Sequence, residues 1–95
     1  MPLFAVQYTY SASTSDRRDV VRPEHRGWLA DGVESGVLVS VGPYPDGSGA
    51  LIVGDAADET AMLALLAQDP FARDGLIDAV RCVEWNPIMG LLSDR

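Results

Sequence analysis

Residues 37–54 read VLVSVGPYPDGSGALIVG, two apolar runs separated by a segment rich in proline and glycine. The runs 37–42 and 50–54 carry the β-branched and aliphatic residues that are typical of strands. The segment between them contains Pro43, Pro45 and the pair Asp46-Gly47, which are residues that form tight turns. The sequence therefore predicts a β-hairpin in the middle of the chain.

A strand and a helix are predicted on the N-terminal side of this hairpin. Residues 3–10, LFAVQYTY, carry apolar residues at both alternating sets of positions, as a central strand does. The polar segment 11–19, SASTSDRRD, is expected to be a connector. A helix follows it, with Pro23 in the first turn and Gly36 as the glycine that ends the helix.

A second helix and a fourth strand are predicted on the C-terminal side. Asp58 begins the helix, and the helix stops before Pro70 because the residue that precedes a proline avoids the helical region. Residues 69–75, DPFARDG, are expected to form a short turn or a 3₁₀ piece, and residues 77–85 the last strand. The tail 88–95 either docks on the domain or stays loose.

The predicted order is βαββαβ over a single domain, residues 1–95. This is the α+β, ferredoxin-like arrangement, in which right-handed crossovers place two helices on one face of a four-stranded antiparallel sheet. The other face of the sheet is then bare, and the first strand is apolar on both sides. Such a face is usually covered by a second copy in a two-fold dimer. We therefore expect a homodimer, in the form of a dimeric α/β barrel.

Composition narrows the classes of partner and site. The net charge is −7 and the chain has no lysine, which argues against a nucleic-acid partner. No apolar run approaches the length of a membrane span, and the N-terminus has no signal-peptide pattern, so the expected compartment is the cytoplasm and no membrane partner is expected. One histidine and scattered acids give no metal-ligand spacing, so we expect neither a metal nor another cofactor.

The predicted topology brings three groups that can carry chemistry to one edge of the sheet. His25 lies at the start of the first helix, Asp46 lies in the hairpin turn, and Asp69 follows the second helix. Glu34 is expected at the other end, on the opposite face of the first helix, because each residue turns the helix by about 100°. Asp69 is the favoured partner of His25, and Asp46 is the alternative.

His25 in a first helical turn would have specific electrostatics, since the helix N-terminus disfavours a charged imidazolium. A neutral imidazole that a carboxylate orients is a competent general base, so His25 and Asp69 are the candidate catalytic residues. Arg22, Trp28, Tyr44 and Asp46 are the candidate substrate-binding residues, with the two aromatic rings as apolar walls for a small ligand. The alternative is structural, with the histidine as a helix-start residue and the aspartates as turn and helix-end residues.

Three motifs in order resemble the YCII-related family of small dimeric α/β-barrel proteins. The first is R-x-x-H-x-x-x-L, the second is G-x-L-x-x-x-G-P, and the third is D-P-[FY]-x-x-x-G-L. Here they are Arg22, His25 and Leu29, then Gly36, Leu38, Gly42 and Pro43, then Asp69, Pro70, Phe71, Gly75 and Leu76. The match extends from the first strand to Trp85. The resemblance implies a ferredoxin-like fold, a dimer with back-to-back sheets, and a His–Asp active site.

Two classes of function follow. The first is a cofactor-free lyase or isomerase that acts on a small cyclic or aromatic metabolite, with His25 as general acid/base and Asp69 as the residue that orients it. A dehydrochlorinase of aromatic catabolism is among the few members of the resembled family with an assigned reaction. The second class is a ligand-binding or regulatory module without turnover. A His–Asp hydrogen bond inside a closed pocket would favour catalysis, whereas a pocket with a neutral histidine and no unsatisfied acid would favour binding.

Overall fold

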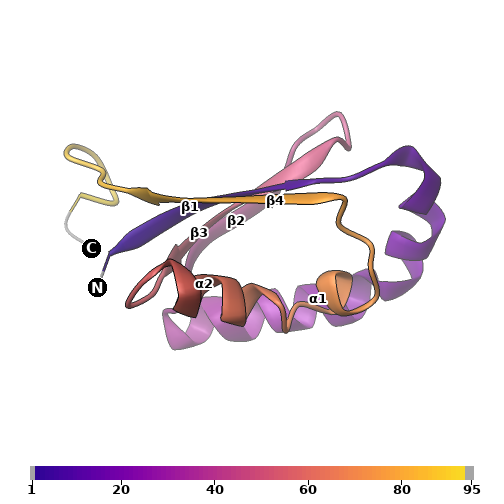
Figure 1. The fold of residues 1–95 in the computed structure, drawn as a ribbon, viewed down its shortest axis with the longest axis horizontal. Helices are drawn as coiled ribbons and strands as arrows, with labels where there is room; N and C mark the ends of the chain where they lie inside the picture. Colours follow the sequence, from indigo (N-terminus) through magenta and orange to yellow (C-terminus); the bar gives the residue numbers. More distant parts are fainter. Residues whose placement is uncertain (1, 94–95) are drawn as a thin grey trace.

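A computed structural model describes residues 2–93 and has the predicted α+β, ferredoxin-like order. Four strands form one antiparallel sheet in the order β2-β3-β1-β4, and the helices lie along one face of it (Figure 1). The elements are β1 Leu3–Thr9, a 3₁₀ turn Ala12–Thr14, α1 Ser15–Ser35, β2 Leu38–Pro43, β3 Gly49–Asp55, α2 Glu59–Leu66, α3 Pro70–Arg73 and β4 Ala79–Trp85. None of the described helices is both long and apolar enough to cross a membrane.

The central hairpin is confirmed. β2 and β3 pair from Leu38 opposite Gly54 to Pro43 opposite Ala50, and the register shifts between residues 38 and 40. The turn closes through Asp46, whose carboxylate accepts a bond from the Ser48 N–H at 2.9 Å. Gly47 follows at a φ of 76°, the left-handed region in which glycine carries no steric cost. The Asp46-Gly47 pair therefore acts as the turn chemistry predicts.

The predicted start of the first helix is wrong. α1 begins at Ser15, so Pro23 lies inside the helix and most of the expected connector 11–19 is a 3₁₀ turn and the first helical turn. The Thr14 side chain does not cap the helix, but the Arg18 guanidinium reaches back to the Ser11 carbonyl at 3.0 Å and to the Thr14 hydroxyl. As a result, His25 lies in the middle of α1, and the argument from the charge of a helix terminus does not apply to it.

The other predicted boundaries lie close to the observed ones. Gly36 ends α1 at a φ of 87°, and the Asp58 carboxylate caps α2 by accepting a bond from the Ala61 N–H at 2.8 Å. The expected turn after Asp69 is a one-turn helix, α3, and Asp69 is its N-cap residue. The tail 86–93 exposes Ile88, Met89 and Leu91, and residues 94–95 lie outside the described part.

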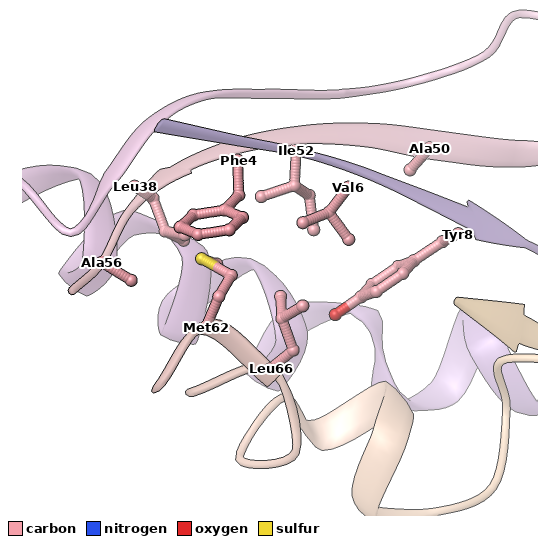
Figure 2. Packing of buried hydrophobic residues seen from close by; sticks show 9 residues of the cluster. All are labelled: Phe4, Val6, Tyr8, Leu38, Ala50, Ile52, Ala56, Met62 and Leu66. Carbon is pink, nitrogen blue, oxygen red and sulfur yellow. The ribbon is translucent and has the colours of Figure 1, made fainter. Parts of the chain in front are cut away.

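The core lies between the sheet and the helices. Phe4, Val6 and Tyr8 alternate along β1 and point to the helical side, where Ile52 of β3 and Met62 of α2 pack against them (Figure 2). The full cluster consists of Phe4, Val6, Tyr8, Leu38, Ala50, Ile52, Ala56, Met62 and Leu66. Each fully buried large apolar side chain contributes about 1.5–3 kcal/mol relative to exposure. The hydroxyl end of Tyr8 extends from this cluster toward the segment that joins α2 and α3.

Candidate active site

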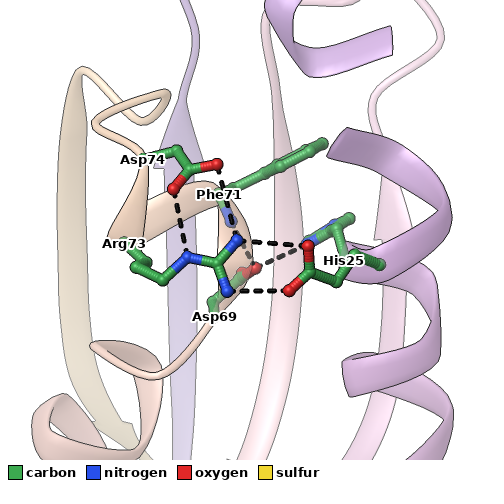
Figure 3. A network of polar contacts seen from close by, with 6 residues as sticks. His25, Asp69, Phe71, Arg73 and Asp74 are labelled. Atoms are coloured by element: carbon green, nitrogen blue, oxygen red, sulfur yellow. Dashed lines mark hydrogen bonds and ion pairs between the residues drawn. The ribbon is translucent and has the colours of Figure 1, made fainter. Parts of the chain in front are cut away.

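His25 and Asp69 are in direct contact. The His25 Nδ1 atom lies 2.7 Å from Asp69 Oδ1, with the histidine projecting from α1 toward the start of α3 (Figure 3). The histidine is 8% exposed and the aspartate is fully buried. Since a carboxylate has no proton to donate, the ring nitrogen that faces it carries the hydrogen. The contact therefore assigns the proton of a neutral imidazole to Nδ1.

Two further donors fix the Asp69 carboxylate. The Tyr8 hydroxyl donates to Oδ2 at 2.9 Å, and the Phe71 N–H donates to Oδ1 at 3.0 Å. The first donor comes from β1 and the second from the first turn of α3. Both carboxylate oxygens act as acceptors, which is the role of an ionised carboxylate. Burial and the neighbouring Asp69 raise the pKa of Tyr8 well above its usual range, so Tyr8 keeps its proton and donates.

Phe71 sets the plane of the imidazole. The two rings are stacked, with centroids 3.7 Å apart and planes 4° from parallel. With Nδ1 on Asp69 and one ring face on Phe71, the free polar atom of His25 is Nε2. No group of residues 2–93 forms a hydrogen bond with it. Nε2 is therefore the ring nitrogen that has no partner among the described residues.

Tyr10 also contacts Phe71. The two rings meet edge to face with centroids 5.9 Å apart, and the Arg18 guanidinium lies 4.5 Å over the Tyr10 ring. Burial, followed by the Asp69 charge, raises the pKa of Tyr10 to about 12, against the opposing effect of Arg18 and Arg22. Tyr10 is therefore a hydrogen-bond donor at neutral pH and not a base.

A cavity of about 560 Å³ lies beside this network, within the usual size range of small-molecule sites. It lies between α1 and the helical face of the sheet. Its walls are mainly apolar, and the polar residues in its lining are Tyr8, Tyr10, Arg22, His25, Arg26 and Glu34. No cluster of three or more His, Cys, Asp or Glu side chains suited to a metal occurs within residues 2–93. The cavity thus combines an apolar interior with one oriented imidazole.

The four predicted substrate-binding residues do not all reach this cavity. Arg22 lines it, and its guanidinium pairs with Asp19 at 2.5 Å. Trp28 instead lines a separate hollow near Leu38 and Leu65 and packs on the core, because it projects about 60° further round α1 than His25 does. The prediction that Trp28 forms a wall beside His25 is wrong.

The two predicted substrate-binding residues of the β2–β3 turn, Tyr44 and Asp46, are also absent from the cavity lining. Tyr44 and Asp46 belong to the turn, where Tyr44 accepts the Gly47 N–H at its carbonyl and Asp46 accepts the Ser48 N–H at its side chain. Hydrogen bonds from Ser48 lower the pKa of Asp46. The observed bonds therefore place Asp69, and not the alternative Asp46, against His25.

Glu34 was expected on the opposite face of α1 from His25, and the helix does place it there, but both residues nevertheless line the same cavity. The lining stripe of α1 runs through Arg22, Arg26 and Val33, and His25 and Glu34 lie on its two flanks, about 180° apart around the axis. Because the cavity is wide, it is lined by both His25 and Glu34. Glu34 still lies nine residues further along the helix, toward the far end of the cavity.

An exposed ion pair ties α1 to α3 near the site. Arg73 donates to both Glu24 oxygens, at 2.7 and 3.2 Å, and its Nε donates to Asp74 at 3.0 Å (Figure 3). Hydrogen bonds from Arg73 lower the pKa of Glu24 and of Asp74. This pair joins the helix that carries His25 to the helix that Asp69 caps.

Comparison with solved structures identifies proteins of the same fold. The 5-chloro-2-hydroxyhydroquinone dehydrochlorinase of Burkholderia phenoliruptrix, solved in complex with 2,5-dihydroxybenzoquinone, superposes with a TM-score of 0.77. It is 18% identical, over 88% of this chain and 93% of that one. A protein described as an antibiotic biosynthesis monooxygenase from Bacteriodes thetaiotaomicron gives a TM-score of 0.52 at 12% identity, over 93% of this chain and 90% of that one. No curated protein matches the chain.

A protein-family model also matches the chain. The YCII-related domain matches residues 2–86, which include all four strands and the segments that carry His25 and Asp69. The match therefore spans the whole ferredoxin-like unit and both residues of the buried contact. The chain belongs to the YCII-related domain family.

Proposed function

We propose that the protein is a cofactor-free lyase or isomerase that acts on a small cyclic or aromatic metabolite. His25 Nε2 is the general acid/base, and Asp69 orients the ring. The observation that carries this proposal is the contact of Nδ1 with Asp69 at 2.7 Å, because it leaves Nε2 with a lone pair beside an apolar cavity.

The chemistry requires only proton transfer. Nε2 takes a proton from an acidic C–H or O–H of the ligand, and the resulting imidazolium is stabilised by the Asp69 carboxylate. In a lyase, the electron pair of the broken C–H bond forms a double bond, and a leaving group such as chloride departs with its own pair. In an isomerase, the proton returns from Nε2 to a different ligand atom. Neither course consumes an oxidant or a reductant.

The similar fold of a dehydrochlorinase supports this class of reaction. A dehydrochlorinase removes hydrogen and chloride from its substrate, and that enzyme was solved with 2,5-dihydroxybenzoquinone. A ring of this kind is compatible with a cavity of about 560 Å³ whose walls include Phe71 and Tyr10. At 18% identity the likeness concerns the fold.

One observation favours a binding module without turnover as the second candidate. Among the lining residues within 2–93, no second imidazole accompanies His25, and the one carboxylate, Glu34, lies nine residues further along α1. Tyr10 keeps its proton, and arginine is always charged. A lyase whose leaving group must be protonated would therefore have only a weak acid such as Tyr10 among these residues, whereas a binding protein needs none.

The test is turnover of chlorinated and hydroxylated ring compounds, measured by chloride release and by solvent deuterium exchange into the ring. We expect His25→Gln to reduce either rate by about 10²- to 10⁴-fold, the usual range for a general base. Tyr44→Phe, outside the cavity, is the control and should keep the wild-type rate. Ligands that perturb the His25 NMR signals without turnover would support the binding module, and absence of both effects would refute the site.

A homodimer belongs to the same proposal. Residues that alternate away from the helices form an apolar row in the register Val53, Ala5, Val83 across β3, β1 and β4. Leu51, Val83 and Trp85 on this outer face are 43%, 41% and 42% exposed. An apolar sheet face of this kind is expected to pack against another surface. A second copy, with the two sheets back to back, would cover it.

A further inference from the structure

We propose that the cavity beside His25 selects singly charged anionic ligands, with the acidic group of the ligand at Arg26 and a hydrogen-bond donor of the ligand toward Glu34. This inference rests on the proposed functional site and names the class of ligand that the site takes. It concerns binding, so it can be tested whether or not the protein turns the ligand over.

The first observation is the unequal use of charge in the cavity walls. The chain has 14 acidic and 7 basic residues, yet the charged side chains in the lining are Arg22, Arg26 and Glu34, besides the imidazole of His25. The lining therefore reverses the charge balance of an acidic protein. Cationic groups at the wall of an apolar cavity attract anions and repel cations.

The second observation is that one of the two lining arginines is paired with a carboxylate and the other is not. The Arg22 guanidinium is held by Asp19, whereas no hydrogen bond or ion pair joins Arg26 to any of residues 2–93. Arg26 precedes Gly27 in α1 and follows His25 directly, so its guanidinium is attached one residue from the proposed base. A guanidinium presents several N–H donors in a fork that fits a carboxylate or a phenolate oxygen. An anionic oxygen bound there would lie near the atom that His25 deprotonates.

The third observation is the position of Glu34. It follows Arg26 by eight residues, or about 12 Å along the helix axis at a rise of about 1.5 Å per residue. This separation exceeds the Debye length of about 8 Å at physiological ionic strength, so the two charges do not cancel each other. Leu29, Ala30 and Val33 line the stretch between them. Along α1, the cavity wall is therefore cationic at Arg26, apolar in the middle and anionic at Glu34.

A ligand that matches this order has one acidic group, an apolar body such as an aromatic ring, and a hydroxyl or amine at the far end. A second acidic group at the far end would face the Glu34 carboxylate. We therefore expect acids to bind better than their neutral amides, and monoacids with a distal hydroxyl to bind better than diacids.

The probes are 4-hydroxybenzoate, 4-hydroxybenzamide and terephthalate, which share one ring and differ in charge. Their affinities are measured on the full chain from the NMR signals of His25, the single histidine. We expect 4-hydroxybenzoate to bind about twofold to fivefold more tightly than the amide, the effect of one partly exposed charge pair. Arg26→Gln should abolish this preference. Arg17→Gln, the same change on an exposed α1 residue outside the lining, should preserve it.

The anionic end has its own variant. Terephthalate should bind more weakly than 4-hydroxybenzoate to the wild type, and Glu34→Gln should reduce this difference, whereas Asp31→Asn, which changes an acid in a different hollow, should not. Equal binding of acid and amide, or no perturbation of His25 by any of the three probes, overturns the inference. Selective binding of the acid in a protein without turnover would support the inference and count against the enzyme, so the two failures are distinguishable.

Discussion

The hydrogen bond from Tyr8 to Asp69 can be tested directly by Tyr8→Phe. The substitution removes one oxygen atom from a side chain that is 1% exposed and leaves the aromatic ring in the core. It takes from Asp69 Oδ2 a donor at 2.9 Å. Since Asp69 is fully buried, water cannot readily replace the lost hydroxyl. A hydrogen bond to a charged group contributes about 1.5–3 kcal/mol, so we expect the free energy of unfolding to fall by that amount.

Urea denaturation followed by circular dichroism measures this loss, at one fixed protein concentration because a dimer would make stability depend on it. In a domain of this size a loss of about 1.5–3 kcal/mol lowers the melting temperature by roughly 6–24 °C. Tyr44→Phe is the matched control, since no bond joins the Tyr44 hydroxyl to residues 2–93, and it should stay within about 0.5 kcal/mol of the wild type.

A double-mutant cycle with Asp69→Asn isolates the pair. Against a neutral amide the Tyr8 hydroxyl makes an ordinary hydrogen bond of about 0.5–1.5 kcal/mol, so Tyr8→Phe should cost less in the Asp69→Asn background than in the wild type. A cost equal to that of Tyr44→Phe, or the same cost in both backgrounds, would refute the idea that Tyr8 holds an ionised carboxylate.

Three further predictions concern the tautomer, the alkaline limit of stability and the oligomer. Nitrogen-15 NMR of His25 should show a neutral ring protonated at Nδ1, and Asp69→Asn should shift the proton population toward Nε2; an Nε2–H tautomer in the wild type would exclude the proposed base. The pKa of Tyr10 in the folded chain, about 12, lies above its value of 10.0 without burial, so the unfolded chain loses this proton first. The free energy of unfolding should therefore fall as the pH rises from 10 toward 12, less steeply in Tyr10→Phe, and identical pH profiles would contradict this. Sedimentation should give a mass near twice 10.2 kDa, and Leu51→Glu on the outer sheet face should shift it toward the monomer; a monomeric wild type would remove the back-to-back dimer.

The strands and caps could be predicted because their signals are local. The Asp46-Gly47 turn, the Gly36 end of α1 and the Asp58 cap each depend on the conformation or hydrogen bonding of one or two residues. The start of α1 depends instead on two opposing effects, the preference of Pro23 for a first helical turn and the folding of the residues before it into the same helix. Pro23 fits a first turn, and inside a helix it costs about 3 kcal/mol through the lost N–H and the clash with the carbonyl of residue 19. Eight residues before it nevertheless fold into the same helix.

The pairing of His25 with Asp69 follows from topology, but the surroundings of the pair do not. Tyr8 and Phe71 were missed as site residues because an aromatic residue in a strand or after a proline is usually interpreted as a core residue. Both residues are indeed buried. Whether Trp28 or Glu34 reaches the cavity depends on the width of the cavity and on how α1 is rotated against the sheet. Those quantities are set by packing across the whole domain, which residue spacing does not specify.

The Asp69 carboxylate serves the fold and the proposed chemistry at once, and this affects how the chemistry can be tested. Its three donors come from β1, α1 and α3, so one side chain ties the sheet to both helices at the point where the imidazole is oriented. Asp69→Asn keeps one acceptor oxygen in place of two, so the three donors can no longer all donate to residue 69, and each donor left unpaired costs about 1–3 kcal/mol. A loss of activity in Asp69→Asn is therefore ambiguous between misorientation of His25 and partial unfolding. His25→Gln disrupts fewer bonds, since it leaves Tyr8 and the Phe71 N–H on the carboxylate. If His25→Gln abolishes turnover while the free energy of unfolding changes by much less than in Asp69→Asn, the function of the imidazole is separated from its contribution to the fold.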